Sequence, residues 1–278
     1  MATIGSSERP DLPLAAVIGS GGLGLVTARR LAQTHRVVIA SRNAVAIEER
    51  AAALRDEGLD VTGVACDITD GESVAALAAM LRARGPLRAC AHVAALSPSM
   101  GDWRTLMHTN LTGTARIEQA MFALAGAGTA AVFVGSLASH TLTPAEAIVS
   151  LLDDPLGDGT IERIERLMPE TSSLLAYQLS KFALKRMCER RAAAWGTRGA
   201  RIVSISPGLV ATPMGALEFR NQPVKHDLLA ATPLAREATM PEIVDAIEFL
   251  ASGRASFITG VDLLVDGGVM AAMRHRGS

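Results

Sequence analysis

The only tyrosine of this 278-residue chain, Tyr177, stands four positions before Lys181, which is one of only three lysines. Residues at positions i and i+4 of a helix lie on the same face, and the local pattern predicts a helix from about residue 173 to 195. An ammonium group close to a phenol favours the phenolate and lowers the pKa of the phenol. The pair is therefore a candidate for proton exchange with an alcohol or a carbonyl. A core tyrosine beside a lysine that reaches the surface is the alternative.

A glycine-rich turn separates the first predicted strand from the first predicted helix. Gly19, Gly21 and Gly24 have the spacing G-x-G-x-x-G. Glycine allows the backbone to turn tightly and approach a pyrophosphate, which the free amides of the helix N-terminus then stabilise. This context predicts dinucleotide binding, although glycines at such a turn can also serve packing alone. The residues of the turn expected at the cofactor are Gly19, Ser20, Gly21, Gly22, Leu23 and Gly24.

The second predicted strand indicates which dinucleotide is bound. It ends at Ser41 and Arg42, roughly twenty residues after Gly19, where a NAD-binding protein normally offers Asp or Glu to the adenosine ribose. A carboxylate would repel a 2′-phosphate, whereas a hydroxyl and a guanidinium can bind one. The sequence therefore favours NADP(H) over NAD(H). Asp67, after the third predicted strand, either contacts the adenine edge or serves as a carboxylate at the start of the next helix.

The elements that must position these groups alternate along the chain. Short apolar runs and amphipathic stretches follow each other from Leu14 onwards, which predicts a parallel sheet with helices on both faces. Seven strands are expected, and a long helix is expected around residues 102–124. No repeat or linker divides the series. We therefore predict an α/β chain with a flexible leader of residues 1–13 and a single doubly wound Rossmann-like domain over residues 14–278.

Two segments interrupt this alternation. Residues 141–172 and 209–240 each follow a strand, at the sheet edge where ligands of open parallel sheets bind, so both are expected to form walls or a lid over a site. The second is predicted to be a substrate lid. In the first, apolar residues at helical spacing predict two short amphipathic helices before the catalytic helix. These residues are Ile148, Leu151, Leu152, Ile161, Ile164, Leu167 and Met168. Surface loops without a function are the alternative.

Composition limits the partners and the location. A formal charge of −1 and a pI near 6.6 give no broad basic face for nucleic acid or a lipid surface. Apolar stretches are interrupted before the ~20 residues that a membrane-spanning helix needs, and the N-terminus does not resemble a secretory signal, so a cytoplasmic protein is expected. Cys66, Cys90 and Cys188 cannot pair completely and are expected to be buried. The six histidines show no metal spacing, so no metal site is predicted.

Together these motifs resemble the short-chain dehydrogenase/reductase family over residues 14–270. The resemblance rests on the glycine-rich turn, Asn110 in HTNLTG, Ser136 in VFVGSLAS, the tyrosine–lysine pair, SPGLVATP and ITGVDLLVDGG. It implies a Rossmann-like fold, a nicotinamide cofactor and hydride transfer at a carbon–oxygen centre. It makes Tyr177 the proton donor or acceptor, while Lys181 lowers the pKa of the phenol and holds the nicotinamide ribose. Ser136 would then bond the reacting oxygen, and Asn110 would position a water in a proton relay.

The resemblance also extends the expected cofactor site. Besides the glycine-rich turn, Ser41, Arg42, Tyr177 and Lys181, the set comprises Asp67, Ile68, Ala94, Pro207, Gly208, Val210 and Thr212. Two features depart from the family pattern. The usual Asn-Asn-Ala-Gly after the fourth strand reads His92-Val93-Ala94-Ala95, and the glycine turn is one residue shorter than its commonest form. His92 is either a polar contact near the cofactor or a strand-end histidine with its bonds satisfied.

The function predicted from these residues is an NADP(H)-dependent carbonyl reductase or secondary-alcohol dehydrogenase. A hydrophobic substrate, such as a steroid, a quinone or another ketone, is expected from Leu137, Leu142, Met214 and Leu217. The long interval between the serine and the tyrosine is similar to that of bacterial 3α-hydroxysteroid dehydrogenase/carbonyl reductases. Because residues 141–172 would occupy the flank where many family members pair helices, a homodimer is expected rather than a tetramer. A related lyase or isomerase and a non-catalytic NADP(H) sensor are the alternatives.

Overall fold

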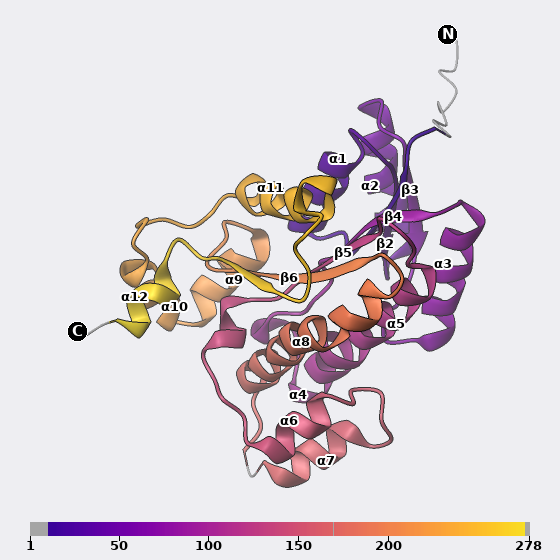
Figure 1. Cartoon of the computed structure of the whole chain (residues 1–278). Coiled ribbons are helices and arrows are strands. Elements are labelled where there is room, and N and C mark those ends of the chain that lie inside the picture. Colours follow the sequence, from indigo (N-terminus) through magenta and orange to yellow (C-terminus); the bar gives the residue numbers. More distant parts are fainter. Residues whose placement is uncertain (1–10, 169, 276–278) are drawn as a thin grey trace.

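The computed structural model describes residues 11–168 and 170–275, and seven parallel strands form its centre (Figure 1). The strands are β1 (Leu14–Ile18), β2 (Arg36–Ser41), β3 (Val61–Ala65), β4 (Leu87–His92), β5 (Ala130–Val134), β6 (Arg201–Pro207) and β7 (Asp262–Val265). Their order in the sheet is β3-β2-β1-β4-β5-β6-β7. The direction of strand progression reverses between β1 and β4, which places a ligand crevice at the carboxyl ends of these strands. The predicted doubly wound fold is confirmed.

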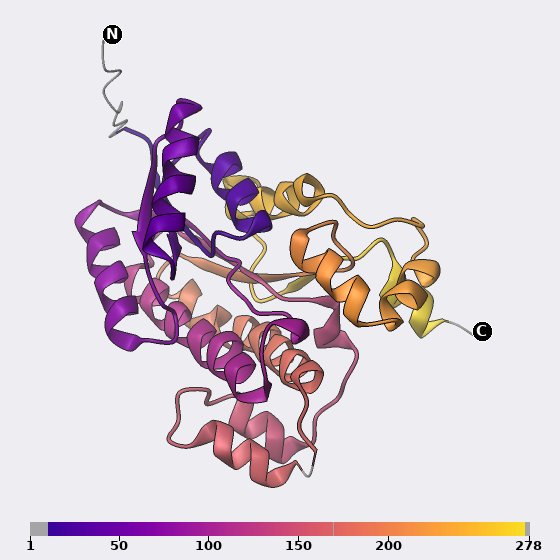
Figure 2. The same cartoon turned by 180° about the vertical axis from the view of Figure 1, so that it is seen from behind.

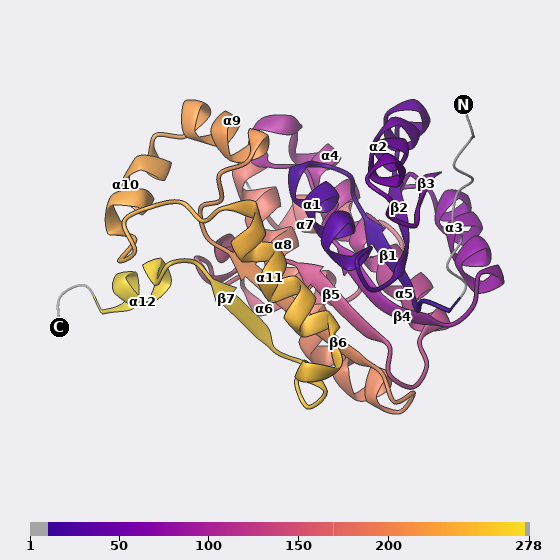
Figure 3. The same cartoon turned by 90° about the horizontal axis from the view of Figure 1, so that it is seen from above.

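Helices cover both faces of the sheet (Figure 3). One face carries α1 (Gly22–Leu31), α2 (Ala44–Asp56) and α11 (Met240–Ala251), and the other carries α3 (Gly71–Ala83), α5 (Thr114–Leu124) and α8 (Ser173–Gly196). Side chains of a strand alternate between the two faces. In β1, Ala15 and Val17 pack in the core with α1 and α2, while Ala16 and Ile18 pack with α3 and α8. Both faces are buried, which explains the continuous apolar runs.

The long helix expected around residues 102–124 is wound in three ways. It begins as α4 (Trp103–Leu106), continues as the π-helical segment η2 (Met107–Gly113) and ends as α5. Asp102 starts it by accepting a hydrogen bond of 2.8 Å from the backbone N–H of Thr105. The π-helical segment contains Asn110, and π-helical turns are frequent at functional sites.

The segment of residues 141–172 forms the two expected helices, α6 (Glu146–Leu152) and α7 (Thr160–Leu167). They pack with α4, η2 and the first half of α8 around one apolar cluster, at the end of the molecule away from the N-terminus (Figures 1 and 2). Five of the seven predicted apolar residues are buried in this cluster and Met168 packs against it. Leu167 was expected to join them but is 54% exposed, because it ends α7 on the outer side.

The second irregular segment also contains helices, which the sequence did not predict. These are α9 (Pro213–Asn221) and α10 (Val224–Ala231), and α12 (Val269–Arg274) packs against α10. Three short 3₁₀ turns complete the chain: η1 (Pro98–Met100), η3 (Leu137–His140) and η4 (Gly253–Ala255). Residues 1–10 of the predicted leader lie outside the described residues. All three cysteines are buried, and no helix in residues 11–168 or 170–275 has the length and apolarity needed to cross a membrane.

Candidate active site

Ser136, Tyr177 and Lys181 line one cavity of about 220 Å³ at the carboxyl end of the sheet. Ser136 follows β5 and starts η3, where its Oγ accepts a hydrogen bond of 3.2 Å from the N–H of Ala138. Tyr177 and Lys181 lie in the first turns of α8, and Lys181 Nζ donates a hydrogen bond of 2.8 Å to the carbonyl of Val134, the last residue of β5. The structure thus brings together three of the four predicted catalytic side chains.

The electrostatics of the tyrosine differ from the sequence expectation. Burial raises the pKa of Tyr177, the hydrogen bond with Ser136 lowers it, and the charge of Glu218 raises it further, so that the pKa lies above its usual value. The expected lowering by Lys181 is not found in the structure. Lys181 Nζ lies 5.8 Å from the centre of the phenol ring, and burial lowers the pKa of Lys181 itself to about 8. In this structure the phenol is therefore poised as a proton donor.

Asn110 makes a different contact from the predicted one. Its side-chain amide accepts a hydrogen bond of 2.8 Å from the N–H of Leu96 and donates one of 2.8 Å to the carbonyl of Leu96. Both residues are buried. The amide therefore fixes the chain after β4, beside the cavity wall that Ala95 and Ser97 form. The side-chain amide thus serves to hold Leu96, and the predicted water relay stays a prediction.

Of the three motif glycines Gly19, Gly21 and Gly24, one has open space around it and two are tightly packed. A Cβ on Gly24 would lie 2.0 Å from the carbonyl oxygen of Gly19, and one on Gly19, whose φ is +109°, would lie 2.7 Å from the nitrogen of Ala94. A Cβ on Gly21 would meet no atom within 4 Å. Gly21 caps α1, whose first turn contains no acidic residue and whose cap makes no side-chain hydrogen bond. The open space and free amides at Gly21 fit the pyrophosphate of a dinucleotide.

The residues predicted for the adenosine end lie near one another. Arg42 is exposed after β2, and Asp67 follows β3, its neighbour in the sheet. Asp67 Oδ1 accepts hydrogen bonds from the N–H and hydroxyl of Thr69, at 2.9 and 2.7 Å. Burial raises the pKa of Asp67, but these bonds and the charge of Arg42 outweigh it and lower the pKa. The carboxylate that caps α3 is Asp70 and not Asp67, so the alternative interpretation of Asp67 is wrong.

Arg50 joins this region without having been predicted. Its Nη1 donates hydrogen bonds of 2.8 Å to the carbonyl of Ser20 and 2.5 Å to the Ser20 hydroxyl. The guanidinium therefore reaches from α2 to the glycine-rich turn. No motif marks Arg50, because its position depends on how α2 packs against the sheet. The only available signal is its place on the polar side of an amphipathic helix.

The segment predicted for the nicotinamide end begins at the last residue of β6. Pro207, Gly208, Val210 and Thr212 line the cavity, as predicted. Val210 pairs with Ala238 in a short parallel bridge. Thr212 caps α9 by accepting a hydrogen bond of 2.8 Å from the N–H of Gly215, so the predicted cofactor segment leads directly into the lid.

Three predicted residues lie behind this wall. Ala94 packs under Gly19 and donates a hydrogen bond of 2.8 Å to the carbonyl of Ile18. Ile68 is buried in the core beneath α3. His92 is buried, its Nε2 lies 3.0 Å from Thr114 Oγ1, and burial with the nearby charge of Lys181 lowers its pKa to about 3. His92 is thus a neutral core residue at the end of β4.

The remaining cavity wall is part apolar and part polar. Of the four residues on which the hydrophobic substrate was predicted, Leu137 and Met214 line the cavity. Leu142 packs instead against the cluster of α6 and α7. Five further polar residues also line the cavity: Ser97, Glu218, Gln222, Lys225 and Glu237. None of the described residues of 141–172 lines it, so the expectation that this segment walls the substrate site is wrong; the segment packs on the flank of α8 instead.

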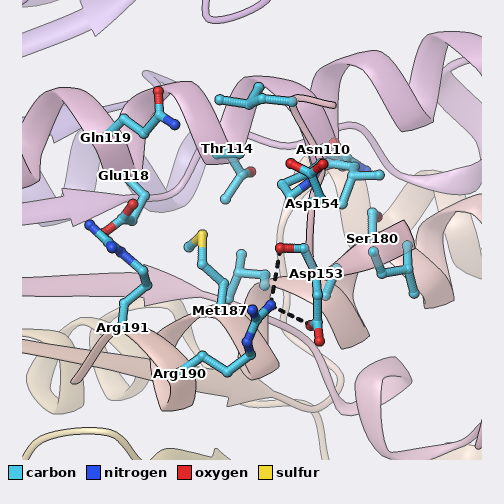
Figure 4. Close-up of a pocket in the computed structure, with 17 residues that line it drawn as sticks. Asn110, Thr114, Glu118, Gln119, Asp153, Asp154, Ser180, Met187, Arg190 and Arg191 are labelled. Carbon is cyan, nitrogen blue, oxygen red and sulfur yellow. Dashed lines mark hydrogen bonds and ion pairs between the residues drawn. The ribbon is translucent and has the colours of Figure 1, made fainter. Parts of the chain in front are cut away.

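A second cavity, of about 380 Å³, lies on that flank (Figure 4). Arg190 of α8 donates hydrogen bonds to Asp153, which follows α6, including one of 3.0 Å to its carbonyl. Glu118 of α5 is buried and accepts hydrogen bonds of 2.8 and 2.7 Å from Arg191 and Trp195. The contacts of Arg190 hold the segment of residues 141–172 to α8, and those of Glu118 join α5 to α8. No group of three or more metal-binding side chains is found in the described ranges.

Two protein-family models match the chain. The model described as short chain dehydrogenase matches residues 14–148, and the model described as Enoyl-(Acyl carrier protein) reductase matches residues 161–270. The gap between the two matches falls within the segment that contains α6 and α7.

Relatives and solved structures match over nearly the whole chain. A galactitol 2-dehydrogenase (L-tagatose-forming) of Cereibacter sphaeroides is 33% identical and covers 94% of this chain and 96% of its own. A short-chain dehydrogenase/reductase of Alternaria brassicicola is 31% identical and covers 92% and 94%. The structure of a 3-alpha-hydroxysteroid dehydrogenase of a Pseudomonas species, complexed with NADH, is 24% identical, covers 95% and 99%, and has a TM-score of 0.76. This last likeness shows the fold.

Proposed function

The chain belongs to the short-chain dehydrogenase/reductase family of oxidoreductases, and from that membership we propose that it interconverts a carbonyl and a secondary alcohol with NADP(H). One observation carries the proposal. Ser136, Tyr177 and Lys181 meet in a cavity that also contains the glycine-rich turn and the segment after β6. A proton-transfer group and the elements of a dinucleotide site therefore share one space.

The residues divide the chemistry between them. The bound dinucleotide would supply or accept the hydride. In the reducing direction Tyr177 donates its phenolic proton to the substrate oxygen, and the hydroxyl of Ser136 donates a hydrogen bond to the same oxygen. The raised pKa of Tyr177 keeps it protonated and therefore suits reduction. Lys181 would hold the ribose beside the nicotinamide, and Asn110 would order the water that returns a proton.

We propose NADP(H) as the preferred dinucleotide because the adenosine end offers cations. Arg42 follows Ser41 in the sequence, and Arg50 is hydrogen-bonded to Ser20. No acidic residue stands at the end of β2. Guanidinium groups bind phosphate with charge-assisted hydrogen bonds. Arg50→Gln should raise the KM for NADPH about tenfold and change the KM for NADH little. Arg55→Gln is the matched control on the same helix, since Arg55 bonds Glu48 and the carbonyl of Val61. Equal effects on both cofactors would exclude reading of the 2′-phosphate by Arg50.

We propose that the substrate has an apolar body. Leu137, Leu209, Met214 and Phe219 line the cavity around the tyrosine and support this choice. The names of relatives include dehydrogenases of galactitol and D-threitol, which are polyols, so the substrate class must be measured. The rest of the proposal is a cytoplasmic enzyme without nucleic-acid or membrane partners, in keeping with the formal charge of −1.

We also propose a homodimer that forms through β7 and the C-terminal helix. β7 is the edge strand of the sheet, and Phe257 (fully exposed), Val261 and Leu263 present apolar surface beside it. The flank of α8 is in contact with α6 and α7. Light scattering should give a dimer for the intact protein and a monomer for Phe257→Asp. Leu167→Asp, at an exposed position of α7, should remain a dimer. A tetramer, or a dimer that Phe257→Asp leaves intact, would contradict this arrangement.

The activity is tested by following NADPH oxidation with panels of steroid, quinone, diketone and aliphatic ketones. Tyr177→Phe should lower turnover by about 10²- to 10⁴-fold while NADPH affinity stays near that of the wild type. Unchanged turnover in this variant would discard the mechanism. If the protein binds NADPH but turns over no carbonyl, a non-catalytic sensor becomes the better description. Formation of a dehydrated or epimerised product without net NADPH consumption would instead indicate a lyase or isomerase.

A further inference from the structure

Two of the three lysines of the chain line the catalytic cavity. Lys181 belongs to the proposed mechanism, whereas Lys225 stands at the start of α10 in the lid and has no part in it. The side chain of Lys225 is partly buried, and no hydrogen bond or ion pair joins it to another residue among those that the structure describes. A cation that is withdrawn from water without a partner is unfavourable. Such a group points to an anion supplied from outside the chain.

The nearby carboxylate of Glu218 does not fulfil that role. Burial lowers the pKa of Lys225, and although the charge of Glu218 raises it, burial prevails. Glu218 is itself engaged: Oε1 accepts a hydrogen bond of 3.0 Å from the N–H of Ser99, and Oε2 accepts one of 2.6 Å from the amide of Gln222. The bond to Ser99 ties the lid helix α9 to η1, and the bond to Gln222 closes the end of α9. Glu218 therefore serves to hold the wall together and leaves the ammonium group of Lys225 without a hydrogen-bond acceptor.

A second unpartnered group lines the same cavity. Ser97 is 2% exposed, and its Oγ has no hydrogen-bond partner within residues 11–168 and 170–275. Ser97 precedes η1, and Ser99 of η1 is bonded to Glu218 of α9. Ser97 also follows Leu96, which is bonded to the side chain of Asn110. Its position is therefore fixed by neighbours on both sides. A buried hydroxyl without a partner is costly, and a ligand oxygen in the cavity would satisfy it.

From Lys225 and Ser97 we infer that the substrate is a keto acid or hydroxy acid whose carboxylate, remote from the reacting carbon, binds the Lys225 ammonium group at the lid. Ser97 donates a hydrogen bond to an oxygen of the same substrate, and the apolar side chains contact the carbon skeleton between the two ends. The inference rests on the proposed oxidoreductase function and specifies its substrate class.

The test compares keto acids of increasing length with their carboxamides, which have nearly the same shape but no charge. Because a hydrogen bond to a charged group is worth about 1.5–3 kcal/mol, wild type should prefer each fitting acid by roughly tenfold to a hundredfold in kcat/KM. Lys225→Met should reduce that ratio to near one, mainly through KM for the acid, while activity on the amide persists. Lys225→Arg should retain the preference. Lys185→Met, the third lysine, lies outside the cavity and should behave as the wild type.

A binding measurement separates this inference from the proposed function. Saturated carboxylic acids that match the best substrates should compete with the ketone in the wild type and lose at least about tenfold in affinity in Lys225→Met. Ser97→Ala should weaken acids and amides alike. If ketones are reduced but acids are not preferred, or if Lys225→Met leaves the acid-to-amide ratio unchanged, the carboxylate assignment is overturned. If no carbonyl is reduced while the acids still bind through Lys225, the oxidoreductase proposal fails and the anion site stands.

Discussion

Gly21 and Gly24 offer a matched pair of substitutions that separates cofactor binding from folding. In Gly24→Ala, the new Cβ would lie 2.0 Å from the carbonyl oxygen of Gly19. An ordinary carbon–oxygen contact is about 3.3 Å or longer, so this carbonyl must retreat by roughly 1.3 Å. Gly19 cannot move freely, because its N–H donates a hydrogen bond of 2.8 Å to Ala40 and Ala94 packs against it. We expect Gly24→Ala to lower the free energy of unfolding by about 3 kcal/mol or more.

Gly21→Ala should have the opposite profile. The φ of Gly21 is −63°, which any residue adopts, and no protein atom lies within 4 Å of the added methyl group. The free energy of unfolding should change by less than about 1 kcal/mol, because a small entropic gain offsets a poorer helix cap. NADPH affinity should fall at least about tenfold, because the methyl group enters the space expected for the pyrophosphate. Urea unfolding and NADPH fluorescence titration measure the two quantities. Wild-type NADPH affinity in Gly21→Ala would refute the placement of the dinucleotide.

Three further changes test other parts of the structure. Asn110→Ala removes two buried hydrogen bonds to Leu96 and should lower the free energy of unfolding by about 2–4 kcal/mol. The control Asn43→Ala removes the single exposed cap bond of α2 and should lower it by about 1 kcal/mol. Equal losses in urea unfolding would contradict the role of Asn110 in holding Leu96. Glu118→Ala should cost about 2–3 kcal/mol, discounted for the partial exposure of Arg191, and Glu118→Gln should cost less because an amide oxygen still accepts from Trp195. Burial lowers the pKa of Lys181 from 10.5 to about 8, so between these pH values the unfolded chain binds more protons than the folded chain. The free energy of unfolding of the cofactor-free protein should therefore rise with pH from about 8 towards 10. Lys181→Met should remove this rise, and an unchanged slope of unfolding free energy against pH in that variant would refute the role of Lys181.

The sheet could be predicted because its strands are buried on both faces. The fully buried stretches of β1, β2 and β5 therefore appear as unbroken apolar runs, as in Val37, Val38 and Ile39 of β2. The amphipathic helices between them have one apolar stripe each, and this stripe faces the sheet. The order of strands followed from the βαβ series and the resemblance. Here the local pattern and the tertiary structure impose the same requirement on each residue.

The lid helices could not be predicted for a related reason. Glu218 is the only buried residue of α9, and α10 has none among its described residues. Met214 and Phe219 of α9 line a cavity, and the apolar side chains of α10 only partly cover a small cluster with α12, so neither helix has a strong apolar stripe. The π-helical winding around Asn110 is equally hidden, since no residue type in Met107–Gly113 marks it and the Leu96 contact of Asn110 lies outside the helix. Arg50 was missed because only the packed position of α2 brings it to Ser20.

Lysine and arginine occupy different kinds of position in this structure. The ion pairs found in residues 11–168 and 170–275 use arginine, apart from the contact between His140 and Asp262. Arginine keeps its charge and its planar set of donors, which suits paired carboxylates. Lysine responds to burial: the pKa values of Lys181 and Lys225 are both lowered by loss of water, and both residues line the catalytic cavity. A buried ammonium group gains most from a ligand that restores a partner. Under the proposed function, Lys181 and Lys225 stand where a bound cofactor or substrate would supply a partner, whereas the ion-paired arginines already have a partner within the protein.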